Sequence, residues 1–213
     1  MPQQIIDLSH LIQNDMPTYP GDQAPEIKTI ISLGEKNYKE TGISMSTHTG
    51  THVDAPSHVF ANGTSLDSFP IEKFIGNGKV IDCSRKETIA VDHLKILLAS
   101  YCPEFLLIHT GWDSHWGTTH YFSDFPALEP EAVRFLESLP LKGIGIDTPS
   151  FDRVESVTLP IHKSLLGNEM VLIENLTGLK ALLEKQFTFY CLPLKIKDSE
   201  GSPVRAIAIF EDR

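Results

Sequence analysis

The chemistry-bearing residues of this chain gather in one short segment. Three of the nine histidines fall between positions 48 and 58, in the run His48-Thr-Gly-Thr-His52-Val-Asp54-Ala-Pro-Ser-His58. Imidazole nitrogens and carboxylates are ligands that Zn²⁺ and Mn²⁺ accept. Three such ligands with a water in the remaining position form an open, catalytic metal site. The segment therefore predicts a catalytic metal centre.

The backbone of this segment has to bend if its side chains are to share a site. All four ionisable residues occupy even positions, so on an extended strand they would face the same side. An extended chain would nevertheless separate His48 from His58 by ~33 Å, at ~3.3 Å per residue. Gly50 and Pro56 are residue types suited to bends. A purely structural role is the alternative for these histidines, and the interleaved carboxylate favours the metal centre. The segment is not an H-E-x-x-H metalloprotease motif, because none of its three histidines is followed directly by Glu.

The elements that must position this segment are mostly short strands. Runs bounded by Gly, Pro, Asn or Asp predict strands at residues 4–8, 26–32, 79–83, 105–109, 143–147, 170–174, 187–196 and 204–210. Helices are predicted at residues 91–100, 130–139 and 179–184, the first from its apolar spacing and the second from proline in its first turn. Strands outnumber helices without a strict β-α-β rhythm. The expected fold class is therefore mixed α/β with a mixed or largely antiparallel sheet.

Length and composition narrow the class of protein. The 213 residues suit a single domain spanning 1–213, and no repeat or composition break divides them. A formal net charge of −10 argues against a nucleic-acid partner, which would need clustered Lys and Arg. No apolar run approaches the ~18 residues of a membrane span, and the N-terminus has no signal-peptide pattern. The three scattered cysteines favour reduced thiols, so we expect a cytoplasmic protein.

The segment 48–58 resembles the hallmark of the cyclase family of metal-dependent hydrolases, which includes bacterial kynurenine formamidases. That hallmark is H-x-G-T-H-x-D-x-P-x-H, and the sequence matches it in full. Shorter stretches at residues 7–9, 16–22, 159–166, 173–176 and 201–206 are also similar to the family, so the likeness runs nearly from end to end. The resemblance implies a swivelling β/β/α fold with a mixed sheet, assembled as a homodimer or homotetramer.

The resemblance also implies roles for individual residues. The positions that match metal ligands, for one or two ions of Zn²⁺ or Mn²⁺ per chain, are His48, His52, Asp54, His162 and Glu174. His58 matches the catalytic residue that accepts and donates protons. Tyr19 stands where kynurenine formamidases tend to carry Trp, so we expect it to contact the ring of an aromatic substrate.

Some features of the sequence remain open. Residues 110–116 hold two Trp that would either cover a site or pack an irregular loop. Asp147 ends a predicted strand and has the character of a turn former. Five further histidines are left unassigned, and most of them are expected not to be ligands: His10, His93, His109, His115 and His120.

The predicted activity is hydrolysis of a small amide or formamide C–N bond with metal-activated water. His58 would carry the proton between water and the leaving nitrogen. Kynurenine formamidase proper and a hydrolase of cyclic amides or lactones are the alternatives within the enzyme class. A metal-holding or ligand-binding protein without turnover is the alternative outside it.

Overall fold

One large mixed sheet forms the centre of the molecule. In the computed structural model, which describes residues 3–99 and 101–211, its strands run in the order β1-β13-β11-β5-β7-β9-β10-β4-β12. The bounds are β1 Gln3–Asp7, β4 His52–Asp54, β5 Ile75–Asp82, β7 Phe105–His109, β9 Gly143–Ile146, β10 Val171–Glu174, β11 Phe187–Tyr190, β12 Gly201–Pro203 and β13 Ile207–Glu211. Two smaller sheets pair β2 Glu26–Ile31 with β3 Glu40–Ser44 and β6 Thr88–Ile89 with β8 Ala127–Leu128.

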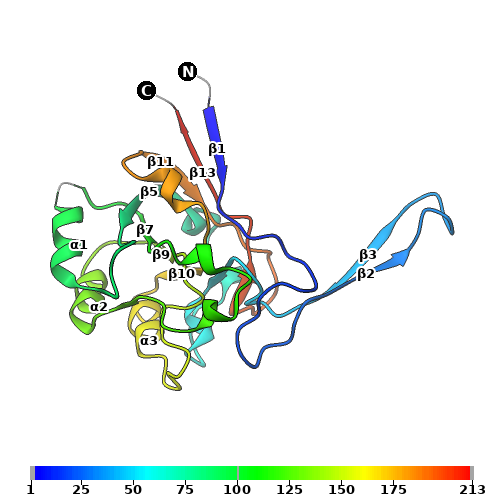
Figure 1. Cartoon of the computed structure of the whole chain (residues 1–213), viewed down its shortest axis with the longest axis horizontal. Coiled ribbons are helices and arrows are strands. Elements are labelled where there is room, and N and C mark those ends of the chain that lie inside the picture. The colour runs from blue at the N-terminus through cyan, green and yellow to red at the C-terminus, as the bar shows by residue number, and fades with distance from the viewer. Residues whose placement is uncertain (1–2, 100, 212–213) are drawn as a thin grey trace.

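The middle of the sheet is parallel and its flanks are antiparallel. β5, β7, β9 and β10 run parallel, whereas β1, β13, β11, β4 and β12 each join by antiparallel pairing. The helices α1 Val91–Leu98, α2 Pro130–Glu137 and α3 Pro160–Leu166 lie along the chain between successive parallel strands. They gather on one side of the sheet, as Figure 1 shows. The mixed α/β class and the mixed sheet expected from the sequence are confirmed.

Two apolar layers sandwich the parallel strands, because neighbouring residues of a strand point to opposite faces. On β7, Leu106 and Ile108 pack with the helices, while Phe105 and Leu107 pack with the opposite layer. That second layer is closed by the antiparallel strands and by the 3₁₀ turn Leu179–Leu182. Every residue of β7 is buried, as is usual for strands covered on both faces.

Several predicted boundaries were wrong for identifiable reasons. The strand expected at 187–196 ends at Tyr190, since Pro193 has no N–H for a ladder. The strand expected at 204–210 begins at Ile207, because the chain leaves β12 at one edge and enters β13 near the other. The helix expected at 179–184 is the single 3₁₀ turn that follows Gly178 (φ +71°). The predicted helix 91–100 ends at Leu98, and its last residue lies outside the described residues.

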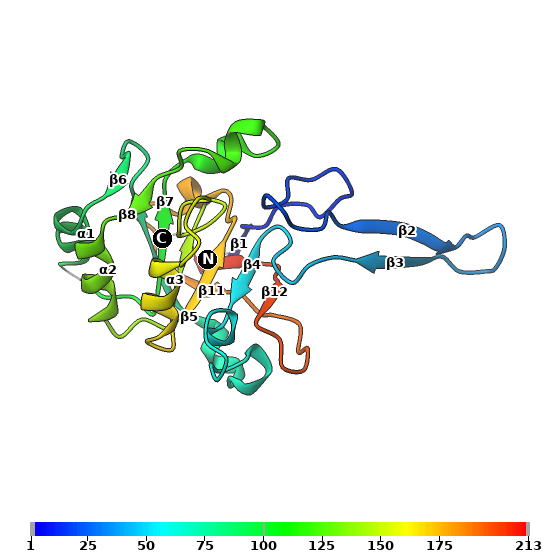
Figure 2. The same cartoon turned by 90° about the horizontal axis from the view of Figure 1, so that it is seen from below.

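Several elements were not predicted, among them α3 and β3. α3 is only seven residues long, too short to reveal a helical period, and it follows Leu159 in a left-handed conformation (φ +46°). β3 contains Gly42 and polar residues, which disfavour strands. β3 and β2 form a long hairpin that extends away from the rest of the molecule (Figures 1 and 2). Among the described residues, no helix has the length and apolar character needed to span a bilayer.

Candidate metal centre

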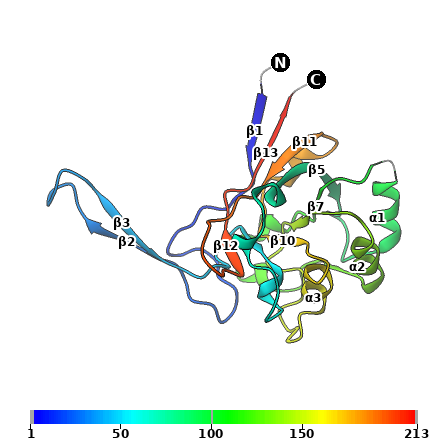
Figure 3. The same cartoon turned by 180° about the vertical axis from the view of Figure 1, so that it is seen from behind.

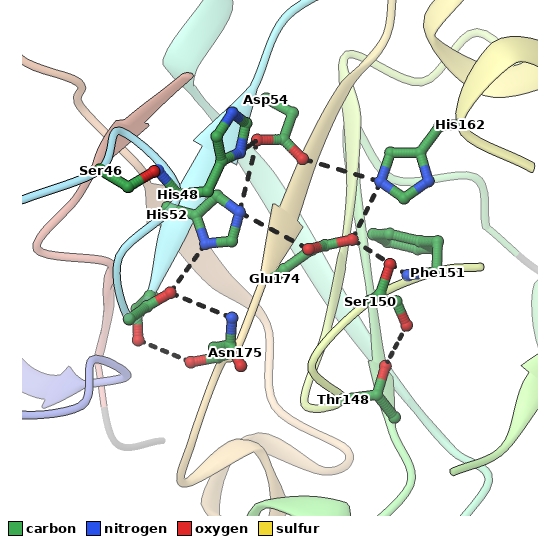
Figure 4. Close-up of polar contacts among 12 residues, drawn as sticks. Ser46, His48, His52, Asp54, Thr148, Ser150, Phe151, His162, Glu174 and Asn175 are labelled. Atoms are coloured by element: carbon green, nitrogen blue, oxygen red, sulfur yellow. Dashed lines mark hydrogen bonds and ion pairs between the residues drawn. The ribbon is translucent and has the colours of Figure 1, made fainter. Parts of the chain in front are cut away.

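The histidine-aspartate segment bends where the sequence predicted. Gly50 has a positive φ of +64°, β4 covers His52–Asp54, and a 3₁₀ turn follows at Pro56–His58. β4 pairs with β10 on one side and with β12 on the other, so it is buried along its whole length. The bend allows side chains from both ends of the segment to reach one place. His48, His52 and Asp54 converge there, as Figure 4 shows.

The carboxylate of Asp54 is the centre of the cluster. Its Oδ1 lies 2.8 Å from Nδ1 of His48 and 3.4 Å from Nε2 of His52, and its Oδ2 lies 3.8 Å from Nε2 of His162. The side chain is 1% exposed, yet neither oxygen accepts a hydrogen bond of acceptable geometry. Burial opposes ionisation, but His48 and His52 hold the pKa of this carboxyl below its usual range. A buried carboxylate without hydrogen-bond donors is one that a cation would stabilise.

Glu174 adds a second carboxylate from the end of β10. The register of β10 and β4 sets it directly opposite His52, with its Oε2 3.5 Å from Nε2 of that ring. Its Oε1 lies 3.0 Å from Nε2 of His162 and accepts a hydrogen bond from the backbone N–H of Phe151 at 3.0 Å. The strand-end position expected for Glu174 is confirmed, and two imidazoles converge on its oxygens.

The donor atoms fit one or two divalent ions. Nitrogen and oxygen atoms of His52, Asp54 and Glu174 lie within 4.8 Å of one another, and so do those of His48, Asp54 and His58. Asp54 belongs to both sets, so its carboxylate is the donor group that they share. Mixed imidazole and carboxylate donors are the chemistry that Zn²⁺ and Mn²⁺ accept.

In two of the imidazoles, the ring nitrogen that points away from the carboxylate cluster has a partner that fixes the orientation of the ring. Nδ1 of His52 lies 2.7 Å from the carbonyl oxygen of Gly50, which directs Nε2 toward the carboxylates. Nδ1 of His162 lies 2.7 Å from Asp152, with the same consequence for its Nε2. An N–H donated from one ring nitrogen leaves the other free to bind a metal.

Burial and neighbouring charges shift the pKa values of three imidazoles in this cluster, and not in the same direction. Burial disfavours the charged form of His48 and of His162, but the surrounding carboxylates raise their pKa values to about 9 and about 10. Burial is also the main influence on His58, and there it lowers the pKa. The imidazole of His58 forms no hydrogen bond or ion pair with any described residue, although its ring centre lies 4.3 Å from that of His48. It is therefore the least restrained imidazole of the cluster.

A cavity of about 250 Å³ opens beside these side chains and has one aromatic wall. Tyr19, Trp116 and Phe122 line it together with Leu159, and the ring centres of Tyr19 and Phe122 lie 6.1 Å apart, edge to face. Burial is the main cause that raises the pKa of Tyr19 to about 12, so its phenol is neutral at physiological pH. The same cavity is lined by His48, His52, Asp54, His58, His162 and Glu174. The arrangement suits a small molecule with a ring at one end and a polar reacting group at the other.

The two Trp of the loop after β7 have different surroundings. Trp116 lines the cavity and stacks on His10 with ring centres 3.8 Å apart. Trp112 donates its Nε1–H to the carbonyl of Tyr121 and does not line the cavity. Of the two roles considered for this loop, Trp116 therefore covers the site and Trp112 packs within the loop.

Two functional neighbours were missed by sequence reasoning. Asp152, 2% exposed, holds His162, and its only signal was a carboxylate ten residues before a histidine. Asn175 donates from Nδ2 to the carbonyl of Gly50 at 3.1 Å and accepts the hydroxyl of Tyr121 at 2.7 Å. It follows Glu174 directly and has a left-handed backbone (φ +55°), a conformation that asparagine tolerates. No local pattern would have linked it to Gly50.

Asp147 and His109 form a separate buried pair. Asp147 accepts hydrogen bonds from Nδ1 of His109 at 3.0 Å and from the backbone N–H groups of Thr110 and Gly111. Neither residue lines the cavity. Asp147 thus organises the turn after β7, in agreement with the turn-forming character inferred from the sequence.

Comparisons with known proteins agree with this geometry. Residues 6–153 match the family model described as "Putative cyclase". The chain is 32% identical over 204 residues to a kynurenine formamidase of Bacillus anthracis and 31% identical over 205 residues to one of Bacillus mycoides. These alignments cover 95% of this chain and 95% of the first relative, and 96% of each for the second.

Solved structures share the fold along nearly the whole chain. Isatin hydrolase A from Labrenzia aggregata, bound to benzyl benzoate, superposes with a TM-score of 0.89 at 28% identity, covering 99% of this chain and 94% of that one. A predicted metal-dependent hydrolase from Bacillus stearothermophilus gives a TM-score of 0.83 at 26% identity, covering 98% and 99%. The fold implied by the motif is confirmed, and a metal-dependent hydrolase is the class of enzyme that these relatives support.

A family model that covers more than half of the sequence, curated relatives above 30% identity and a matching fold all lead to one assignment. The chain belongs to the cyclase family of metal-dependent hydrolases.

Proposed function

We propose that this enzyme hydrolyses the C–N bond of a small aromatic formamide or amide at a site that holds Zn²⁺ or Mn²⁺. The observation that carries the proposal is the buried Asp54 carboxylate, whose oxygens accept no hydrogen bond and face three imidazoles beside a cavity lined by aromatic rings. The kynurenine formamidase relatives support the substrate class, since their name describes an aryl formamide hydrolysis. The free cysteines at 83, 102 and 191 fit a reducing compartment, so we place the enzyme in the cytoplasm.

The proposed ligands are His48, His52, Asp54, His162 and Glu174. A divalent ion bound by them supplies Lewis acidity and lowers the pKa of water toward ~7. Asp54 and Glu174 would neutralise the charge of such an ion, and each of them faces both His52 and His162.

His58 is the proposed proton carrier. It lines the cavity and is partly exposed, and its imidazole has no hydrogen-bonding partner among the described residues. A free ring nitrogen there would accept a proton from water and return it to the leaving nitrogen. His48, by contrast, is held between Asp54 at 2.8 Å and Glu200 at 3.4 Å, so its nitrogens are less available.

Tyr19 is the proposed contact for the substrate ring. Its position against Phe122, in the cavity that the charged side chains also line, would hold a planar ring with the reacting carbonyl directed toward Asp54 and Glu174. Tyr offers a smaller face than the Trp found in kynurenine formamidases.

Hydrolysis of a cyclic amide is the second candidate. A specific observation favours it: isatin hydrolase A superposes at a TM-score of 0.89 and 28% identity. Ring opening of a lactam needs the same water activation and the same proton delivery to nitrogen, so the site chemistry does not separate the two substrates.

The first experiment is elemental analysis of the purified protein, combined with hydrolysis assays before and after chelation. The substrates are formanilide, N-formylkynurenine and isatin. Bound metal with chelator-sensitive turnover supports the proposal, and the ranking of substrates selects between the two candidates. Tyr19→Trp should improve N-formylkynurenine relative to formanilide if Tyr19 contacts the ring.

Two outcomes would reject parts of the proposal. A protein that takes up no Zn²⁺ or Mn²⁺ under any reloading condition would exclude the metal centre. A protein that binds metal but turns over none of the three substrates would leave the metal centre intact, and it would favour a binding protein without turnover.

A further inference from the structure

A tight turn brings one more charged side chain to the cavity. The sequence Tyr19-Pro20-Gly21-Asp22 has proline and glycine at the two positions where a type II turn favours them, and Gly21 has a positive φ of +97°. The backbone N–H of Asp22 closes the turn on the carbonyl of Tyr19 at 2.9 Å. The turn belongs to the segment that joins β1 to β2, which Figure 3 shows beside the base of the β2–β3 hairpin. Tyr19 and Asp22 both line the cavity, so the turn fixes their relative positions.

Asp22 is the carboxylate of the cavity that the candidate metal centre leaves unused. Three carboxylates line the cavity, and two of them, Asp54 and Glu174, face the imidazoles. The Asp22 carboxylate forms no hydrogen bond or ion pair with any described residue, and it belongs to neither group of candidate metal donors. Asp22 is also exposed. Its negative charge is thus available to a bound molecule.

No lysine or arginine balances this charge from the cavity lining. Among the described residues, the side chains that line the cavity include neither type. Lys28, the next basic residue along the chain, pairs with Glu26 at 3.1 Å, and Arg153 lines a separate hollow beside α2 and α3. Three of the four imidazoles in the lining face the carboxylates of the metal centre. A substrate therefore meets an uncompensated negative charge at Asp22.

The phenol of Tyr19 responds to the same negative surroundings. Burial is the main cause that raises its pKa to about 12, and the charges of Glu174, Asp152, Asp22 and Glu155 add to the shift. Surroundings that disfavour a phenolate also disfavour an anionic group on a substrate, and they favour a cationic one. The net charge of −10 acts in the same direction at longer range.

We propose that the site selects aromatic amides that carry a protonated amine on the ring, and that Asp22 binds this ammonium group. The inference rests on the proposed function, because it requires the ring to pack on Tyr19 while the amide reaches the metal centre. The turn then holds the ammonium site at a fixed place relative to the ring. An anionic substituent meets Asp22 without a compensating positive side chain, so such substrates are rejected.

The same reasoning bears on N-formylkynurenine, which carries both an ammonium and a carboxylate. Asp22 offers a partner to the ammonium group. The described lining offers no lysine or arginine to the carboxylate, and these are the side chains that bind carboxylates most strongly. An aromatic amide with an amine alone is therefore the better match.

The test compares formanilides that differ only in one ring substituent, each made as its meta and para isomer. The substituents are aminomethyl, which is cationic, ethyl, which has the same shape without charge, and sulfonate, which is anionic. In the better isomer, kcat/KM should be about fivefold higher for aminomethyl than for ethyl, the size expected of one exposed ion pair. It should be lower for sulfonate than for ethyl. The differences should shrink between 0.05 and 0.5 M salt, because salt screens exposed charges.

Variants at two positions separate a local contact from overall charge. Asp22→Asn should remove most of the difference between aminomethyl and ethyl, and Asp22→Lys should reverse the order of the three substituents. Asp15→Asn and Asp15→Lys are the matched controls, because Asp15 is exposed in the same segment and does not line the cavity. They change the net charge equally and should keep the wild-type order. Calorimetric titration with the corresponding anilines measures the same preference without turnover.

The outcomes distinguish this inference from the proposed function. Equal kcat/KM for the three substituents, or an unchanged order in Asp22→Lys, would overturn the charge selection and leave the hydrolase intact. A reversal in Asp15→Lys as well would assign the effect to net charge and would also overturn it. If no formanilide is hydrolysed but the aminomethyl aniline still binds about fivefold more tightly than the ethyl aniline, and only in proteins that retain Asp22, the proposed function fails and the ammonium site stands. A wild type that neither hydrolyses the formanilides nor binds the anilines rejects both.

Discussion

Replacing Asp152 with asparagine should weaken metal binding, although the substitution leaves every proposed ligand in place. Asp152 is 2% exposed and uses both carboxylate oxygens. Oδ2 accepts the backbone N–H of His162 at 3.0 Å and faces its Nδ1 at 2.7 Å, while Oδ1 accepts the N–H of Ile161 at 3.1 Å. Asparagine has one acceptor oxygen, so its amide group must face at least one of these donors. The His162 ring then loses the contact that directs its Nε2 toward Glu174.

The expected magnitude follows from the position of Asp152 behind a ligand. Changing a residue that orients a metal-bound histidine typically costs 10–100-fold in metal affinity, which is about 1.4–2.8 kcal/mol. A buried donor left without its partner costs a further ~1–3 kcal/mol, and that loss appears in the stability of the metal-free protein. Two separate measurements should therefore change.

The assay is competition between the protein and a chromophoric chelator for Zn²⁺, together with thermal unfolding of the metal-free form. Asp198→Asn is the control, because Asp198 is exposed and its left-handed backbone (φ +56°) also suits asparagine. Unchanged metal affinity in Asp152→Asn would refute the reasoning, since it would mean that His162 needs no support or binds no metal. Lower stability with unchanged affinity would make Asp152 purely structural.

Three further results are expected. His58→Ala should keep its metal and lose about 10²–10⁴ in turnover, and metal loss by elemental analysis would instead make His58 a ligand. Gly201→Ala should lower metal affinity, because its methyl would lie 2.8 Å from Cε1 of His48, whereas Gly34→Ala meets no atom within 4 Å and should not. His109 has its pKa raised by its hydrogen bond to a buried aspartate, so the stability it adds is full below pH ~6.5 and is lost as pH rises through the folded pKa. Denaturant unfolding should show the stability difference between wild type and His109→Gln shrinking with pH over that range; a constant difference would contradict it.

The local sequence predicted the part of the site that lies within one turn of chain. Gly50 and Pro56 permit the bends, and alternation along β4 points His52 and Asp54 to the same side. These features depend on neighbours within a few residues, so they can be inferred before the fold is known. The core strands were predicted as strands, though not their parallel pairing, since an uninterrupted apolar run such as β7 is typical of a buried strand.

Where contacts with residues distant in sequence decide the limits of an element, the sequence did not predict those limits. The run 204–210 has strand composition, yet Val204 bridges Pro193 and the chain enters β13 only at Ile207. α3 owes its helix to packing against α2 and β10, because seven residues cannot sustain a helix in water.

The sequence by itself determined which donor atoms this protein possesses: imidazoles and a carboxylate in one bent segment, with further donors at positions 162 and 174. Tertiary structure alone decided which of those atoms meet. Glu174 faces His52 because β10 pairs with β4, and Asp152 holds His162 because the chain between β9 and α3 folds back on itself. Strand order is set by burial of apolar faces over the whole molecule, and no short stretch of sequence contains that information.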